Sequence, residues 1–268
     1  MTDGVDRPAA GRRSPSGGRA VAAEVRVLAL RGVPELEQGD DLGLLLHRAA
    51  AAAGGLRDAD VVVVAQKAVS KVEGRVVALG DVEPSERAIE LAGPDGNPRH
   101  LEWILRESRS IVRSRPPLVI AETRHGFVCA NAGVDLSNAP GEGVAVLLPE
   151  DPDASARRLR AGLVSAGAGP LGVIVSDTFG RPWREGLVDV AIGCAGIAPL
   201  SDWRGRTDLV GRTLEVTNMA VVDQLAAAAG LLMGKDAGVP AVWIEGVRVE
   251  GDGPIAPLLR DGKLDLFR

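Results

Sequence analysis

The residues best suited to chemistry begin with two lysines that directly follow an apolar run. Lys67 and Lys71 stand four residues apart after VVVVA at 61–65, in a chain where only four of the 31 lysines and arginines are lysine. A separation of four places both side chains on one side of a helix or of a strand. Two compact ammonium groups at the end of a strand suit phosphate oxygens. A solvated basic edge is the alternative explanation of the pattern.

A second group of polar residues follows a run of small ones. The sequence CANAGV at 129–134 precedes Asp135, and Asn138 lies three residues further on. Small side chains let the backbone approach a ligand. A carboxylate followed by an amide is an oxygen-rich set of the kind that hard divalent cations prefer. An ordinary Asx turn would carry the same residues.

A third group lies where the predicted strand 173–175 ends. Asp177 and Thr178 can present two oxygens to one Mg²⁺ or Mn²⁺, and the following Arg181 and Arg184 can bind an anion through paired hydrogen bonds. The alternative is a helix cap with arginines on the surface. Taken together, two acidic sites, a lysine pair and an arginine pair describe metal-assisted phosphoryl chemistry.

Standard nucleotide-binding motifs are misplaced or missing. GAGPLG at 167–172 matches the dinucleotide fingerprint, but a predicted helix precedes it and a predicted strand follows it, the reverse of what the fingerprint requires. GLLMGK at 230–235 has one residue too few between its glycines for a P-loop, and Asp236 stands where the hydroxyl should be. The motifs of serine hydrolases, zincins and paired-cysteine zinc sites are also missing from the sequence.

The order of predicted elements indicates an α+β fold. Helices and strands mix without strict alternation, and a hairpin is predicted around 123–126, so we expect two mixed α/β lobes with mixed or antiparallel sheets. The strands are predicted at 24–30, 61–65, 144–148, 173–175 and 241–244, and the helices at 44–53 (capped by Asp40 or Asp41), 98–113, 154–166 (begun by Asp151 or Asp153) and 221–233.

Three expectations concern domain organisation. Residues 1–20 are rich in Gly, Pro, Ser and Arg and read as a disordered tail. Residues 21–268 form the folded module. The Gly- and Pro-rich stretch 165–172 is the candidate boundary between its two lobes.

Composition excludes several classes of protein. A net charge of −5 argues against a general nucleic-acid binder, and 3% aromatic residues with no tyrosine argue against a base-stacking platform. Two cysteines, Cys129 and Cys194, are too few for a secreted disulfide scaffold and favour a reducing, cytoplasmic setting. No apolar run reaches the roughly 18–20 residues of a membrane span. We therefore expect neither nucleic acid nor membrane as a partner.

Four longer strings resemble a known family. DVVVVAQKAVSK (60–71), ETRHGFVCANAGVDLSN (122–138), VSDTFGRPWREG (175–186) and EVTNMAVVDQLAAAAGLLMGK (215–235) are similar to the GTP-dependent coenzyme F420-0:L-glutamate ligases, also called γ-glutamyl ligases. The resemblance spans nearly everything from residue 24 onward. It implies an enzyme that uses GTP to activate the terminal carboxylate of the phospholactyl deazaflavin as an acyl phosphate. L-Glutamate then displaces phosphate, and further γ-linked glutamates can follow.

The resemblance also implies site residues and cofactors. GTP would be the co-substrate, with two divalent ions, Mg²⁺ or Mn²⁺, and a monovalent cation as a further candidate. The implied metal ligands are Asp135, Asp177 and Thr178, and the implied nucleotide contacts are Gln66, Lys71 and Asn138 with the backbone of Val33, Pro34, Glu35 and Leu36. Lys235 stands where some relatives offer a further oxygen ligand, and a protonated lysine cannot coordinate a metal.

Charge and placement add a hypothesis about the acceptor. We expect Arg124, His125 and Arg184 to bind the phosphodiester and carboxylate groups of the substrate, and Arg184 to act with Asp135 and Asp177 in catalysis. A histidine that only shapes the hairpin is the alternative for His125.

The resemblance further implies a homodimer of two-lobed subunits with active sites near the lobe interface. Some relatives carry a flavin-binding reductase domain after this module. Because the chain stops at Arg268, we expect neither FMN nor reductase activity. Two other functions stay open from the sequence: a catalytically inactive regulator that binds GTP and metal, and an amide ligase of the same fold that acts on a different acid.

Overall fold

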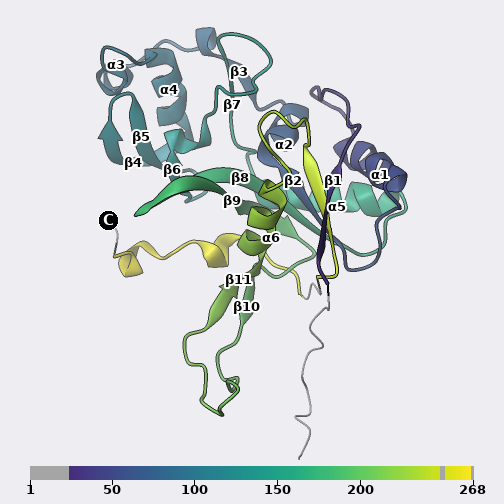
Figure 1. The fold of residues 1–268 in the computed structure, drawn as a ribbon. Coiled ribbons are helices and arrows are strands. Elements are labelled where there is room, and N and C mark those ends of the chain that lie inside the picture. The colour runs from purple at the N-terminus through teal and green to yellow at the C-terminus, as the bar shows by residue number, and fades with distance from the viewer. Residues whose placement is uncertain (1–23, 248–250, 267–268) are drawn as a thin grey trace, which may run out of the picture.

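The centre of the molecule is a mixed five-stranded sheet (Figure 1). The computed structural model describes residues 24–247 and 251–266, so the tail predicted at 1–20 lies outside the described residues. The strand order across the sheet is β1 (Arg26–Leu30), β12 (Ala241–Glu245), β2 (Val61–Ala65), β8 (Gly172–Arg181) and β9 (Arg184–Ala195). Of these neighbours, β2 and β8 are parallel and the others antiparallel. Parallel pairing places Ala65 beside Ser176, so the residues after both meet at one edge.

Three helices pack against this sheet. They are α1 (Leu42–Ala52), α5 (Pro152–Ser165) and α6 (Val221–Gly230), with α1 and α5 together on one side of the sheet and α6 on the other (Figure 1). Asp41, rather than Asp40, caps α1 by accepting a hydrogen bond from the backbone N–H of Leu44, and Asp151, rather than Asp153, caps α5 in the same way. The apolar faces of the three helices and both faces of β2 and β8 form the larger hydrophobic core.

A second, smaller core lies between residues 79 and 147. Its elements group together apart from the central sheet (Figure 1). They are α3 (Glu86–Ala92), α4 (Pro98–Glu107), and the antiparallel strands β4 (Ser108–Arg115), β5 (Leu118–Thr123) and β6 (Val128–Ala130), with β3 (Val76–Ala78) paired to β7 (Val144–Val146). The predicted hairpin is confirmed by the pairing of β5 with β6. Together the two groups confirm the α+β class.

Two further features complete the described chain. Strands β10 (Leu200–Asp202) and β11 (Asn218–Ala220) form a ribbon that, with the loop between them, projects from the body as an arm (Figure 1). Short 3-10 turns occur at Leu79–Asp81, Asn131–Gly133, Ala256–Leu258 and Gly262–Leu264. Among residues 24–247 and 251–266, no helix has both the length and the apolar character to cross a membrane.

Three sequence-based boundaries were wrong by at least three residues, whereas the other predicted ends lie within two residues of the observed ones. The helix predicted at 98–113 ends at Glu107, because the residues that follow pair with β5 as strand β4. The strand predicted to end at 175 continues to Arg181, because it pairs with β9 along its whole length. The helix predicted to reach 233 ends at Gly230. In the first two cases tertiary pairing overrides local periodicity.

The glycine-rich stretch 165–172 follows α5 and leads into β8. This order confirms that its glycines do not open a helix, as a dinucleotide fingerprint would require. Both flanking elements pack into the larger core, so the stretch connects two parts of one core. A domain boundary at this stretch stays a prediction.

Candidate functional site

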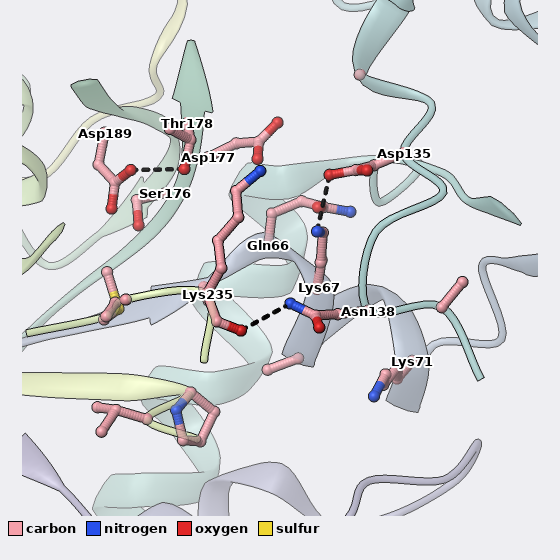
Figure 2. Close-up of a pocket in the computed structure, with 18 of the residues that line it drawn as sticks. Gln66, Lys67, Lys71, Asp135, Asn138, Ser176, Asp177, Thr178, Asp189 and Lys235 are labelled. Atoms are coloured by element: carbon pink, nitrogen blue, oxygen red, sulfur yellow. Dashed lines mark hydrogen bonds and ion pairs between the residues drawn. The ribbon is translucent and has the colours of Figure 1, made fainter. Parts of the chain in front are cut away.

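A single large cavity brings most of the predicted site residues together. Its volume is about 690 Å³, and it opens where β2 ends, beside the second half of β8, the loop that follows β6 and the turn that precedes β12. The predicted residues that line it are Val33, Pro34, Glu35, Leu36, Gln66, Lys67, Lys71, Asp135, Asn138, Asp177, Thr178 and Lys235. Figure 2 shows the polar ones converging from separate elements. The two aspartates that the sequence placed in separate motifs therefore share one pocket.

The lysine pair lies on α2 (Gln66–Val72), which begins directly after β2. The Lys67 ammonium donates to the carbonyl oxygen and hydroxyl of Ser137, at 2.9 and 2.7 Å, and lies 2.7 Å from Asp135 Oδ2. Lys71 Nζ lies 2.5 Å from Glu35 Oε1. Because the two lysine side chains are only 20% and 16% exposed, the alternative of a solvated basic edge is wrong.

Asp135 sits in a tight turn that immobilises its carboxylate. The backbone N–H of Ser137 donates to Asp135 Oδ1 at 2.7 Å, so the Asx turn considered from the sequence is present. The Ser137 hydroxyl donates to Oδ2 at 3.0 Å. Burial alone would raise the pKa of Asp135, but the hydrogen bonds from Lys67 and Ser137 outweigh it and lower the pKa below the usual value. Asp135 is therefore held ionised next to a cation.

Asp177 has the opposite electrostatic environment. It lies within strand β8, so the alternative of a helix cap is wrong for this segment. Burial raises its pKa to about 6, the nearby charges of Asp135 and Asp189 add to the rise, and Lys67 opposes it. A half-buried carboxylate with two other carboxylates nearby is stabilised in its ionised form by a cation that enters the pocket.

Asp189 and Ser176 were missed by sequence reasoning. Asp189 lies on β9 opposite Thr178 and accepts a hydrogen bond of 2.7 Å from the Thr178 hydroxyl. The pairing of β8 with β9 brings Asp189 to the pocket, and no local sequence pattern predicts that strand pair. The Ser176 hydroxyl lines the same wall, is buried, and finds no hydrogen-bond partner among the residues that the structure describes. An unsatisfied oxygen at this position points to a bound polar group.

The other wall carries Gln66, Asn138 and Lys235. The Gln66 amide nitrogen is engaged inside the protein, donating to the Ser70 hydroxyl at 2.6 Å and to the Leu147 carbonyl at 2.8 Å. Asn138 donates from its side chain to the carbonyl oxygen of Lys235 at 3.1 Å and so ties the two loops together. The Lys235 side chain extends toward Asp177 and Thr178 (Figure 2).

Three predicted substrate-binding residues are not brought into the cavity lining. Arg184 begins β9 at the exposed end of the β8–β9 hairpin, and Arg124 lies in the turn between β5 and β6. His125 Nε2 lies 2.9 Å from the Pro149 carbonyl oxygen, and its ring stacks on Phe127 at 5.6 Å between ring centres. This geometry favours the alternative that His125 shapes the hairpin.

The donors present suit a divalent cation that a substrate also ligates. No cluster of three or more His, Cys, Asp or Glu side chains suited to a metal occurs in the described parts of the chain. Among the acidic side chains that line the pocket, Asp135 and Asp177 come from different elements, and the Thr178 hydroxyl and the unsatisfied Ser176 oxygen line the same pocket. Mg²⁺ is typically held by one or two carboxylates, with water and substrate phosphates completing its shell. The residues present therefore fit a cation of this kind.

Comparisons with known proteins match nearly the whole described chain. The profile of the family described as F420-0:Gamma-glutamyl ligase matches residues 32–246, which include every segment that lines the pocket. The protein named Coenzyme F420:L-glutamate ligase from Methanothermobacter thermautotrophicus is 46% identical over 250 residues, covering 91% of this chain and 99% of the relative. Its namesake from Methanopyrus kandleri is 47% identical over 241 residues, 87% of this chain and 94% of the relative. The protein of the same name from Archaeoglobus fulgidus is 41% identical over 246 residues, which cover 91% of this chain and 96% of the relative.

Proposed function

Since the chain belongs to the F420-0:Gamma-glutamyl ligase family, we propose that it is a ligase that joins L-glutamate to coenzyme F420-0 at the expense of GTP. The names of the relatives give the amino acid and the coenzyme. The dependence on GTP, the acyl phosphate and the addition of further γ-linked glutamates belong to the proposal.

The observation that carries the proposal is the meeting of opposite charges in one cavity. Asp135 and Asp177 supply oxygens for cations, and Lys67, Lys71 and Lys235 supply positive charge for phosphates. A carboxylate is a poor electrophile until it is phosphorylated, and its approach to a triphosphate brings several negative charges together. A pocket with fixed cationic side chains and a place for a divalent ion answers that requirement.

In the proposed reaction, an oxygen of the acceptor carboxylate bonds to the γ-phosphorus of GTP while the bond to the β-phosphate oxygen breaks. The products are an acyl phosphate and GDP. The amine of L-glutamate then bonds to the acyl carbon, phosphate leaves, and the surplus amine proton passes to solvent. Mg²⁺ or Mn²⁺, when bound, neutralises the charge that develops on the phosphate oxygens.

The residues of this chain divide the work. The divalent ion would be held by Asp135, Asp177 and Thr178. Lys71 would leave its ion pair with Glu35, and its ammonium would bind a phosphate. Asn138 and the backbone of 33–36 would position the nucleotide. A second divalent ion and a monovalent cation stay predictions, and the Lys235 ammonium already supplies one positive charge in that part of the pocket (Figure 2).

We also propose that the protein is a homodimer. The arm formed by residues 200–220 carries apolar side chains that the described chain leaves uncovered, with Leu209 fully exposed, Val216 89% and Val210 77% exposed. Several exposed apolar side chains on one projecting hairpin are typical of a surface that a partner covers. A cytoplasmic location is part of the same proposal, supported by two cysteines that are both buried and unpaired.

The deciding experiment measures turnover with mass resolution. Purified protein is incubated with GTP, Mn²⁺, L-glutamate and F420-0, and we expect GDP that depends on the acceptor and a product heavier by one glutamyl unit. Asp177→Asn should abolish this activity, whereas Asp95→Asn, which changes an exposed turn residue outside the cavity lining, should not. GTP binding without turnover would favour the inactive regulator, and turnover with another acid alone would favour a different amide ligase.

A further inference from the structure

Lys67 occupies an unusual position for a phosphate-binding lysine. Its ammonium has three hydrogens, and the structure gives it three oxygen partners: Asp135 Oδ2, the Ser137 carbonyl and the Ser137 hydroxyl. All three distances lie between 2.7 and 2.9 Å. The Lys67 side chain is 20% exposed and that of Asp135 is 37% exposed, so the ion pair is partly shielded from water. The ammonium is therefore fully coordinated by the turn that contains Asp135.

This coordination conflicts with the proposed role of Asp135. The carboxylate oxygen that faces Lys67 is also hydrogen-bonded to the Ser137 hydroxyl, and Oδ1 accepts from the Ser137 N–H. Each oxygen thus already has a partner in the protein, and Oδ2 has two. A divalent ion that bound to Asp135 through Oδ2 would have to displace the ammonium, because two cations cannot share one carboxylate oxygen at close range without strong repulsion.

Lys67 also acts on the other aspartate. Burial is the main reason that the pKa of Asp177 is raised, and the charge of Lys67 acts in the opposite direction. The ammonium is thus within electrostatic reach of both carboxylates, as the convergence of Lys67, Asp135 and Asp177 in Figure 2 illustrates. Lys71, one helical turn further along α2, is paired instead with Glu35, and within the described structure it forms no hydrogen bond or ion pair with Asp135 or Asp177.

We propose that Lys67 is a positioning residue whose ammonium holds the Asp135 turn in the conformation that binds a metal ion. When a divalent ion enters with a triphosphate, the ion displaces this ammonium from Asp135. The released ammonium then binds a phosphate oxygen. This inference rests on the proposed function of the site. Its consequence is that the divalent ion binds weakly alone and tightly with GTP, because only the nucleotide offers the displaced ammonium a new partner.

The test measures the affinity for Mn²⁺ in the absence of nucleotide, with electron paramagnetic resonance reporting the concentration of the free ion. Lys67→Met removes the competing charge and keeps the aliphatic stem, so we expect its affinity for Mn²⁺ to rise about tenfold, the order expected on removing one partly buried like charge. The affinity of the same variant for GTP should fall. Opposite signs for metal and nucleotide are not expected of a lysine that only supports the fold, since loss of shape would weaken both.

Matched variants separate the explanations. Lys71→Met removes the same charge from the same helix and pocket without freeing Asp135, so it should weaken GTP and leave the affinity for Mn²⁺ alone within about twofold of the parent. Asp177→Asn should abolish binding of Mn²⁺ at the pocket. If Lys67→Met does not fold, as judged by circular dichroism, Lys67→Gln provides the same change of charge with a polar side chain.

Each outcome bears on one of the two claims. If the parent protein binds Mn²⁺ through Asp177 but the Lys67 variants bind it equally or more weakly, the inference about Lys67 is overturned and the proposed metal site stands. If the parent protein binds no Mn²⁺ with or without GTP, the proposed metal site itself is overturned. Tighter binding of Mn²⁺ in the Lys67 variants together with weaker binding of GTP supports both.

Discussion

In the absence of ligands, the ionised carboxylate of Asp177 should lower the free energy of unfolding, and a variant without that charge should be more stable. Burial raises the pKa of its carboxyl from 3.8 to about 6 in the folded state. A raised folded-state pKa means that the ionised form is disfavoured by folding. The penalty is absent below pH 3.8, grows as pH rises toward about 6, and is complete above it. Asp177→Asn should therefore stabilise the protein at pH 7.5 and have little effect at pH 4.

The size of the effect follows from the shift. A difference of about two pKa units corresponds to about 3 kcal/mol at pH above 6. The asparagine amide is itself a polar group that loses water in the same place, so we expect a net gain of about 2 kcal/mol in the free energy of unfolding. For a chain of this size that gain corresponds to a rise of about 4–8 °C in Tm.

The assay is urea unfolding of the parent protein and the variant at pH 7.5 and near pH 4, without metal or nucleotide. Asp135→Asn is the matched control, because it changes the same residue type in the same pocket. The pKa of Asp135 is lowered by its hydrogen bonds to Lys67 and Ser137, so its ionised form supports folding. This variant should lose stability at pH 7.5, the opposite sign to Asp177→Asn.

One result would refute the reasoning about charge. If Asp177→Asn changed the free energy of unfolding equally at both pH values, the effect would come from packing or hydrogen bonding. The ionised Asp177 carboxylate would then not be disfavoured in the folded state. Adding Mn²⁺ at pH 7.5 gives a second check, because it should stabilise the parent protein and not the variant.

Three other predictions concern the scaffold. Trp243→Phe should cost about 1–3 kcal/mol in urea unfolding, because it removes the buried 2.7 Å hydrogen bond from the indole to Asp60; a smaller loss would mean that water replaces the indole. Gly193→Ala should lower Tm by several degrees, since a Cβ there would overlap the backbone of Pro152, and an unchanged Tm would contradict that packing. Leu209→Asp should convert the dimer to a monomer, as measured by the molar mass from light scattering, and the Tm of the monomer should not fall. An unchanged molar mass would exclude the arm as the dimer interface.

Local signals in the sequence were sufficient for much of the scaffold. Asp41 and Asp151 mark the starts of α1 and α5, and the run VVVVA at 61–65 is a strand buried on both faces. These elements are determined by capping chemistry and by β-branched residues, which act over a few positions. Asp135 and Asp177 were expected in one site because both segments resemble a known family, and both line the same cavity.

Long-range pairing explains what the sequence did not predict. Strand β4 contains Ile111 and Val112, which also fit a helical period, and only its pairing with β5 makes the segment extended. Asp189 reaches the pocket through its register opposite Thr178, which no local pattern specifies. Arg184 was chosen by charge, but the hairpin carries it to an exposed end outside the cavity lining. Charge alone does not tell which side of a strand pair faces a cavity.

The two aspartates proposed as metal ligands, Asp135 and Asp177, reach the pocket from elements of different hydrophobic cores. Asp177 belongs to the central sheet, whereas the turn of Asp135 is bonded through its backbone to Val146 of β7, next to the smaller core. Any ion or nucleotide that both aspartates bind would link the parts of the protein that contain the two cores. Amide hydrogen exchange in 79–147 should then slow on saturation with Mn²⁺ and GTP, far beyond the residues in contact, and the two halves should open together rather than one at a time.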